Sequence, residues 1–140
     1  MQLTRHTDFA FRSLMFLASM PTDTATIQQI ADRFTIPKSH LMKVVSTLSG
    51  NGYVRSTRGK QGGISLAKPA ADITLKEIVV LMEKTLEPFD CAGQNCIILP
   101  SCQLKHAFNG AQEQYLNYLG QYTVADVINN DTSNALHSES

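Results

Sequence analysis

The chain has no tryptophan and only three cysteines among its 140 residues. An odd number of cysteines cannot all pair in disulfides, which argues against a small secreted domain held together by disulfides. Charges or Gly and Pro clusters interrupt every apolar stretch before it reaches the roughly 18 residues that a transmembrane helix needs. The N-terminal segment carries Arg5, Asp8 and Arg12 instead of the apolar core of a secretory signal. We therefore expect a cytoplasmic protein that does not contact a membrane.

The net charge is zero, but the charges are unevenly distributed along the chain. Residues 1–70 contain nine Lys and Arg against three Asp, a balance of +6, and residues 71–140 contain three basic against nine acidic residues, a balance of −6. A polyanion such as DNA is attracted to a surface with the charge of the first half. DNA binding is therefore expected in residues 1–70.

Two short amphipathic segments in this basic half predict a helix-turn-helix, preceded by a largely apolar helix that starts after Thr7 and runs to about Ser19. The sequence Thr26-Ile-Gln-Gln29 is a capping box, which begins a helix that ends near Phe34. Pro37 cannot continue that helix, and we expect Ser39 to be the N-cap of the next one. This next helix has an apolar inner face of Leu41, Val44, Val45 and Leu48 and an outer face of His40, Lys43 and Thr47.

A basic, glycine-rich hairpin is predicted directly after the second of these helices. Residues 53–57 and 64–66 have the pattern of short strands, and residues 58–63 between them contain three glycines and two basic residues. Glycine lets a backbone approach phosphates closely, while basic side chains supply charge or enter the minor groove. The expected DNA contacts on the recognition helix and the hairpin are Ser39, His40, Lys43, Arg55, Arg58 and Lys60.

The acidic half predicts a helix, a loop and a second, longer helix. Thr74-Leu-Lys-Glu77 is another capping box, and apolar residues recur at coiled-coil spacing from Leu104 onward. The expected fold class is therefore mainly α with a small β-hairpin. It consists of a winged helix-turn-helix region (1–84), a cluster-binding loop (85–103), a dimerisation helix with a short C-terminal helix (104–128) and a flexible tail (129–140).

All three cysteines, Cys91, Cys96 and Cys102, lie in the predicted loop. Cysteine is common in protein cores, but the Gly, Asn, Asp and Pro residues around these three are typical of a loop. Thiolates at this spacing converge on one centre only if the backbone turns repeatedly. Three cysteines leave an iron–sulfur cluster one ligand short, so an oxygen or nitrogen group must complete it. Zinc is the alternative, because His106 lies one turn beyond Cys102 and would complete a Cys3His set, although the usual Cys-x2-Cys knuckle is absent.

An enzyme is not expected, because the chain has no Gly-rich dinucleotide fingerprint after a strand and no second redox motif. Two hypotheses remain. The first is a DNA-binding switch controlled by a metal centre on the three cysteines, and the second is a zinc-stabilised winged-helix or protein-interaction module.

The opening Met1-Gln-Leu-Thr4, the hairpin segment 58–69 and the spacing Cys-x4-Cys-x5-Cys resemble the Rrf-type winged-helix transcriptional regulators over about residues 1–128. Within that family, the four-residue first gap is most similar to the nitric-oxide-sensing repressors. The resemblance implies a homodimer that binds operator DNA and releases it in response to nitric oxide. It also implies an iron–sulfur cluster, 4Fe-4S or 2Fe-2S, held by Cys91, Cys96, Cys102 and the partner subunit's Asp8.

Overall fold

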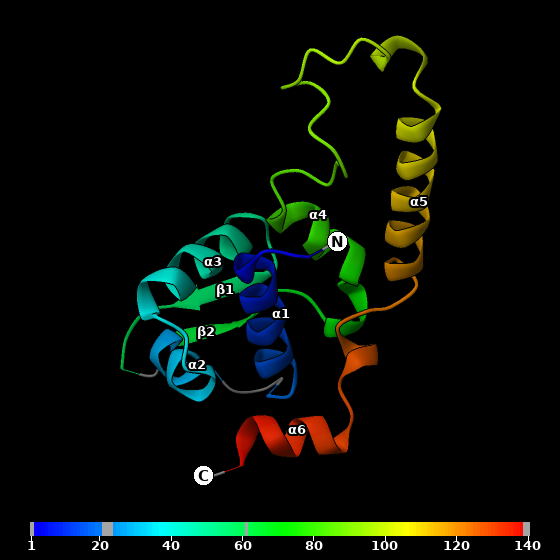
Figure 1. Ribbon diagram of the computed structural model, residues 1–140. Helices are drawn as coiled ribbons and strands as arrows, with labels where there is room; N and C mark the ends of the chain where they lie inside the picture. The colour runs from blue at the N-terminus through cyan, green and yellow to red at the C-terminus, as the bar shows by residue number, and fades with distance from the viewer. Residues whose placement is uncertain (1, 21–23, 61, 139–140) are drawn as a thin grey trace.

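The computed structural model describes residues 2–20, 24–60 and 62–138. Figure 1 shows a helical domain with a small hairpin, from which a loop and a long helix project as an arm. The predicted fold class, mainly α with one hairpin, is confirmed. The elements in chain order are α1 (Arg5–Ala18), α2 (Ile27–Phe34), α3 (Lys38–Gly50), β1 (Val54–Thr57), β2 (Gly63–Leu66), α4 (Leu75–Met82), α5 (Gln103–Leu119) and α6 (Asn130–His137), with short 3-10 turns at Ala70–Asp72, Leu99–Ser101 and Ala125–Val127.

Helix α1 lies at the centre of the domain and buries residues on several sides, including the polar Thr7 and Ser13. It begins at Arg5 and not after Thr7 as predicted, because a distant carboxylate caps it. The Glu83 Oε1 atom accepts hydrogen bonds from the Thr4 backbone N–H at 2.6 Å and from the Thr7 hydroxyl at 2.9 Å. A carboxylate is favourable at the positive N-terminal end of a helix. Residue 83 therefore fixes where the first helix begins.

The helix-turn-helix forms from α2 and α3. Both bonds of the Thr26–Gln29 capping box are present, and the predicted inner face of α3 is buried. The prediction of Ser39 as the N-cap of α3 is wrong: the helix begins at Lys38 with Pro37 at the N-cap position. The Pro37 carbonyl accepts from the His40 and Leu41 N–H groups at 3.0 and 3.2 Å, which starts the helix without a side-chain cap. Ser39 therefore lies within the first turn.

The hairpin pairs β1 with β2 in antiparallel register, with Val54 opposite Leu66 and Thr57 opposite Gly63. An isolated bridge between Ala25 and Ile64 joins β2 to the segment before α2. Gly63 permits this approach, because a Cβ atom there would lie 2.7 Å from the Ala25 carbonyl oxygen. The hairpin is thus attached to the helix-turn-helix by backbone hydrogen bonds.

Residues beyond α5 complete the core of the domain. Val124 is fully buried, and its N–H donates to the Ile73 carbonyl at 2.9 Å. Residues 129–140 were expected to be a flexible tail, but the structure shows that Asn130–His137 form α6. Leu136 of α6 is buried, and the His137 Nε2 atom lies 2.6 Å from the Ser19 hydroxyl at the end of α1. Leu136 therefore holds this segment together with polar contacts, including those from Arg33 to the Ala135 carbonyl and to Ser138.

A polar cluster joins the base of the hairpin to α4. Glu77 accepts from the Thr74 N–H and hydroxyl, both at 2.8 Å, and from the Tyr53 hydroxyl at 3.2 Å. The Lys68 ammonium lies 3.7 Å from Glu77 and over the Tyr53 ring. The hydrogen bond from the Thr74 backbone is the main cause that lowers the pKa of Glu77, and burial opposes it. The ionised carboxylate therefore holds the hairpin base against α4.

Replacing Glu77 by Gln should lower the stability of the fold at neutral pH but not in strong acid. Because the folded-state pKa of Glu77 lies below its ordinary value of 4.5, the stabilisation is complete above that value and is lost as the pH falls through the folded-state pKa. The difference in unfolding free energy between wild type and Glu77→Gln, measured by urea titration at several pH values, should shrink over this acidic range. Glu113→Gln on the exposed face of α5 is the matched control. A pH-independent difference would contradict the charge assignment.

Candidate nucleic-acid interface and cysteine loop

The outer face of α3 is exposed and basic. Ser39, His40 and Lys43, all predicted as DNA contacts, are exposed there. Lys38 and Met42 are exposed on the same helix and were missed by the sequence interpretation. Helical spacing from Ser39 points to Met42 through the i+3 relation, but its apolar character suggested no DNA contact. The face as a whole has the shape and charge of a recognition helix.

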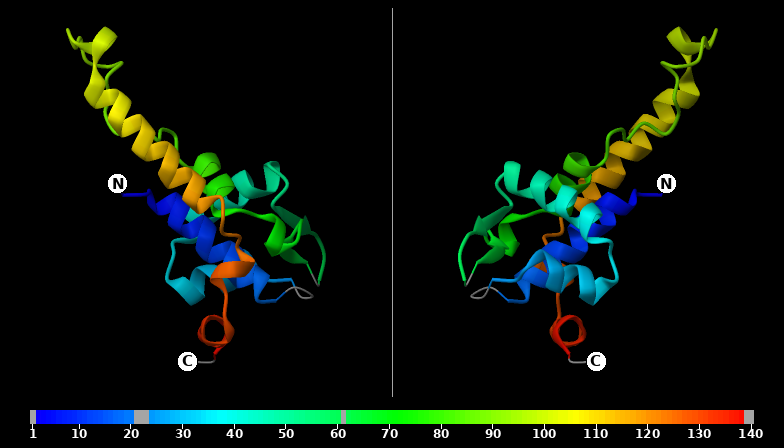
Figure 2. Two further views of the ribbon diagram at one scale, coloured as in Figure 1. Left: turned by 90° about the vertical axis from the view of Figure 1, so that its right-hand side faces the viewer. Right: turned by 90° about the vertical axis from the view of Figure 1, so that its left-hand side faces the viewer.

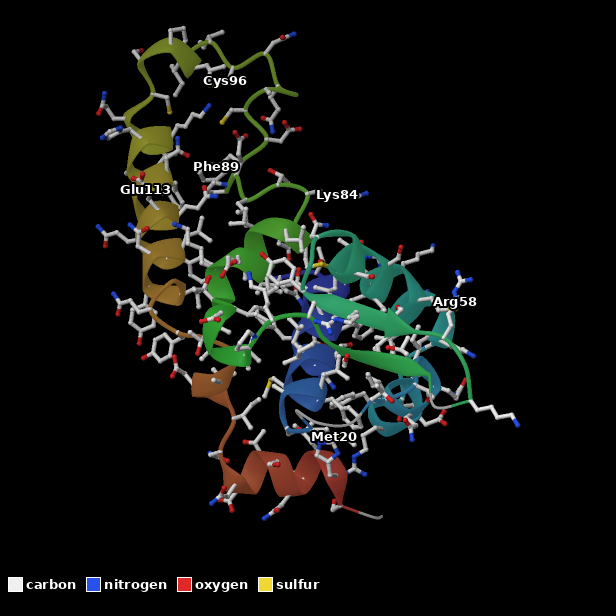
Figure 3. All side chains as sticks on the ribbon, turned by 180° about the vertical axis from the view of Figure 1, so that it is seen from behind. Met20, Arg58, Lys84, Phe89, Cys96 and Glu113 are labelled. Carbon is white, nitrogen blue, oxygen red and sulfur yellow. The ribbon has the colours of Figure 1, made fainter. Side chains whose placement is uncertain are left out.

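The hairpin of β1 and β2, with the turn between them, is called the wing from here on. Its tip carries two exposed cations. Arg58 and Lys60 are both exposed, and Figure 3 shows Arg58 on the hairpin, far from Cys96 on the arm. Gly59 has a φ of 116°, a conformation that glycine adopts without strain. A Cβ atom at Gly62 would collide with the Thr57 carbonyl oxygen. These glycines shape the turn that presents the two basic side chains.

Arg55 lies lower on the wing than Arg58 and Lys60. It is exposed on β1, and its Nη2 atom donates to the Ala67 carbonyl at 3.4 Å. This long hydrogen bond leaves most of the guanidinium open to solvent. Arg55 can therefore contact a phosphate near the base of the wing.

The cysteines lie on the arm, which rises away from the domain on the side opposite α6 (Figure 2). All three are free thiols, with Cys91 and Cys102 half-buried and Cys96 exposed. The Cys102 Sγ atom accepts from the Lys105 N–H at 3.3 Å, so this thiol is the N-cap of α5. The side chains of Cys91 and Lys105 line a common crevice, so Lys105 lies beside two of the three cysteines.

The described residues of a single chain do not assemble a complete metal site. Within the described ranges, no three His, Cys, Asp or Glu side chains lie close enough together to hold a metal ion. Asp8 is exposed on α1 and pairs with Arg12 at 2.9 Å, and His106 is exposed on α5. The chemistry of the donors nevertheless fits an iron–sulfur cluster, because three free thiols are borne by a segment without regular structure over most of its length.

Comparison with known proteins identifies the family. The Rrf2 family, described as an iron-dependent transcriptional regulator, matches residues 3–130. The chain belongs to the Rrf2 family. Its fold is similar to CymR of B. subtilis, described as the global cysteine regulator, with a TM-score of 0.70, 20% identity and coverage of 91% of this chain and 95% of that one. It is also similar to IscR of T. potens, with a TM-score of 0.74, 22% identity and coverage of 90% and 85%.

A third similar structure is the oxidised form of CymR from Staphylococcus aureus, with a TM-score of 0.75, 21% identity and coverage of 91% of this chain and 95% of that one. Identities this low establish the shared fold and not a shared signal. Rrf2 regulators bind DNA and are dimeric, and the described residues contain no helix with the length and apolar character needed to cross a bilayer.

Helix α5 of this Rrf2 chain has an apolar seam that is largely uncovered, with Phe108 in ring contact with Phe89 of the arm. None of its residues is buried, and Leu104, Phe108 and Tyr118 are 59%, 42% and 58% exposed. These three residues belong to the coiled-coil spacing recognised in the sequence, and Gly120 ends the helix as expected. An uncovered seam of this kind is suited to pairing with a second copy of the chain.

We expect Arg58→Ala and Lys60→Ala each to weaken DNA binding and to reduce its dependence on salt. Each lost phosphate contact should lower the slope of log affinity against log salt by about one unit, because fewer counterions are released. Fluorescence anisotropy over a series of salt concentrations measures this slope. Lys84→Ala, at the exposed root of the arm, is the control. Unchanged slopes in both wing variants would show that the wing does not touch DNA.

Proposed function

We propose that this Rrf2 chain is a nitric-oxide-sensitive iron–sulfur repressor of the NsrR type. It binds operator DNA as a homodimer through α3 and the wing, using Ser39, His40, Lys43, Arg55, Arg58 and Lys60. It releases the operator when nitric oxide reaches the cluster, and so controls genes for nitrosative stress. The cytoplasm is its proposed location. The observation that carries the proposal is the set of three free cysteines on an arm attached beside α1 of the DNA-binding domain.

Cys91, Cys96 and Cys102 would hold the cluster, and the partner subunit's Asp8 would complete it. When bound, the cluster supplies iron that reacts with nitric oxide. A carboxylate is a harder ligand than a thiolate and leaves iron more readily, so Asp8 is the bond expected to break first. Asp8 forms an ion pair with Arg12 in the single chain, so it would have an intrahelical partner when it does not hold the cluster. Loss of this ligand would therefore release α1 from the arm of the other subunit.

The structure contains a contact by which the root of the arm touches α1 of its own chain. Glu83 is the first residue after α4 and leads directly into the cysteine loop. Its carboxylate holds the N-terminal turn of α1, the turn that also carries Asp8. Since α1 packs against both α3 and β2, a shift of this turn would change the positions of the recognition helix and the wing. Glu83 is therefore proposed as a positioning residue between the loop and the DNA-binding surface.

The function is tested with protein purified under anaerobic conditions. Iron, sulfide and zinc contents are measured together with the visible absorption spectrum and Mössbauer spectra. Operator affinity is then titrated before and after a measured dose of nitric oxide. Bound iron and sulfide, with DNA released by nitric oxide, support the proposal. Stoichiometric zinc without visible absorption would favour the zinc-stabilised module, in which His106 joins the three cysteines.

Single replacement of Cys91, Cys96 or Cys102 by Ala should abolish cluster binding and leave a folded dimer. None of the three thiols is fully buried, so their removal leaves the core intact. Iron content and analytical ultracentrifugation of each variant measure the two properties. Ser101→Ala, on an exposed neighbour in the same loop, is the matched control. Normal iron content in any cysteine variant would remove that residue from the ligand set.

Asp8→Ala should retain much of the cluster on three thiolates, bind operator less tightly and respond less to nitric oxide. A coupling free energy of about 1–3 kcal/mol, which is a factor of about 5–150 in affinity, is enough to lift repression. Operator titrations of cluster-loaded wild type and Asp8→Ala, with and without nitric oxide, measure the coupling. The variant Arg12→Ala tests whether the effect arises from the Asp8–Arg12 ion pair alone. If Asp8→Ala behaves as wild type, the carboxylate is not the coupling ligand and His106 becomes the next candidate.

A further inference from the structure

The recognition helix has few of the side chains that most often identify bases. Helix α3 contains no Arg, Asn, Gln, Asp or Glu. Arg or Lys pairs with guanine, and Asn or Gln pairs with adenine, through two hydrogen bonds at once. In α3, only Lys38 and Lys43 can make such a bidentate contact, and only with guanine. Any further discrimination between bases by this helix must come from its remaining exposed side chains.

Met42 is the large apolar side chain on the outer face of α3, and it is 52% exposed. The inner face is already occupied by Leu41, Val44, Val45 and Leu48, all buried in the core. On the helix surface Met42 neighbours Ser39 and Ser46 at spacings of three and four residues, and Lys43 follows it directly. Packing of the domain therefore gives no reason for an apolar residue at this position.

The surroundings of Met42 favour DNA over a protein as the group that covers it. The other large apolar residues that are strongly exposed in the described part of the chain lie on α4, the arm, α5 and the segment that follows α5, so Met42 is an isolated apolar group on a basic face. Protein partners usually require a contiguous apolar patch. In the major groove, the one apolar group that a base presents is the C5-methyl of thymine. The N-terminal half of a recognition helix, where Met42 lies, is the part that reaches base edges.

We propose that Met42 recognises the C5-methyl group of a thymine at one position in each operator half-site. This inference rests on the proposed DNA-binding function and adds a base preference to it. The flexible thioether side chain packs on the methyl group, while Lys43 and the wing hold the phosphates. Met42 is thus a specificity-determining residue, and the operator requires thymine where it touches.

The experiment uses full-length protein purified anaerobically and a duplex that this protein selects from a randomised DNA pool. Each thymine in that duplex is replaced in turn by deoxyuridine, which keeps every hydrogen-bonding group and removes only the methyl. Burial of one methyl-sized group contributes about 0.8 kcal/mol, which is about a fourfold change in affinity. The affinity of the wild-type protein should fall about fourfold for each methyl group removed at one position in each half-site. Insensitivity to every deoxyuridine replacement would overturn the proposal.

Variants assign the effect to the side chain. Met42→Ala should bind thymine and deoxyuridine duplexes equally at that position, and Met42→Leu should keep most of the preference. Val80→Ala, an exposed apolar residue on α4, is the control and should keep the wild-type preference. Circular dichroism confirms that each variant is folded. A methyl preference that persists in Met42→Ala would overturn the assignment, whereas failure of wild type to select any duplex would overturn the proposed function itself.

Discussion

Packing around α1 is the constraint on which the other parts of the molecule depend. This helix contacts α2, α3, α4, β2 and α6, and its Leu14 and Leu17 are almost completely removed from solvent. A helix that is apolar on most of its faces is stable only when neighbours cover all of those faces. Helix α1 therefore contacts the helix-turn-helix, the hairpin and the helix that leads into the arm together. A displacement of α1 would disturb its contacts with both α3 and α4.

Local signals in the sequence predicted most of the domain. The capping boxes at Thr26 and Thr74 formed as expected, because each requires only residues three positions apart. The inner face of α3 followed from helical periodicity, and the wing from its glycines and flanking strand pattern. The same reasoning failed where a distant partner decides the outcome. Glu83 caps α1 from far along the chain, and α6, a polar segment without strong periodicity, packs against α1 and buries Leu136.

The candidate site was only partly accessible from sequence, for a related reason. The spacing of Cys91, Cys96 and Cys102 predicts a shared centre, and the charge balance of residues 1–70 predicts the half of the chain that binds DNA. Sequence does not give the distance from Asp8 to these thiols, and the described residues of one chain do not gather three metal-ligating side chains in one place. Met42 was not predicted as a DNA contact, because single apolar residues on a protein surface are common and usually have no function.

The two ends of the segment 75–122 lie side by side. The Leu75 N–H donates to the Tyr122 carbonyl at 2.9 Å, and Thr74 and Thr123 form an isolated bridge. Between these two points the chain forms α4, which packs against α1, and then the arm. Closing a longer loop between ends already in contact costs only about 0.6 kcal/mol for each doubling of its length. The number and spacing of cysteines in the loop can therefore change at little cost in stability. Changes confined to the arm could thus let one winged-helix scaffold respond to a different signal.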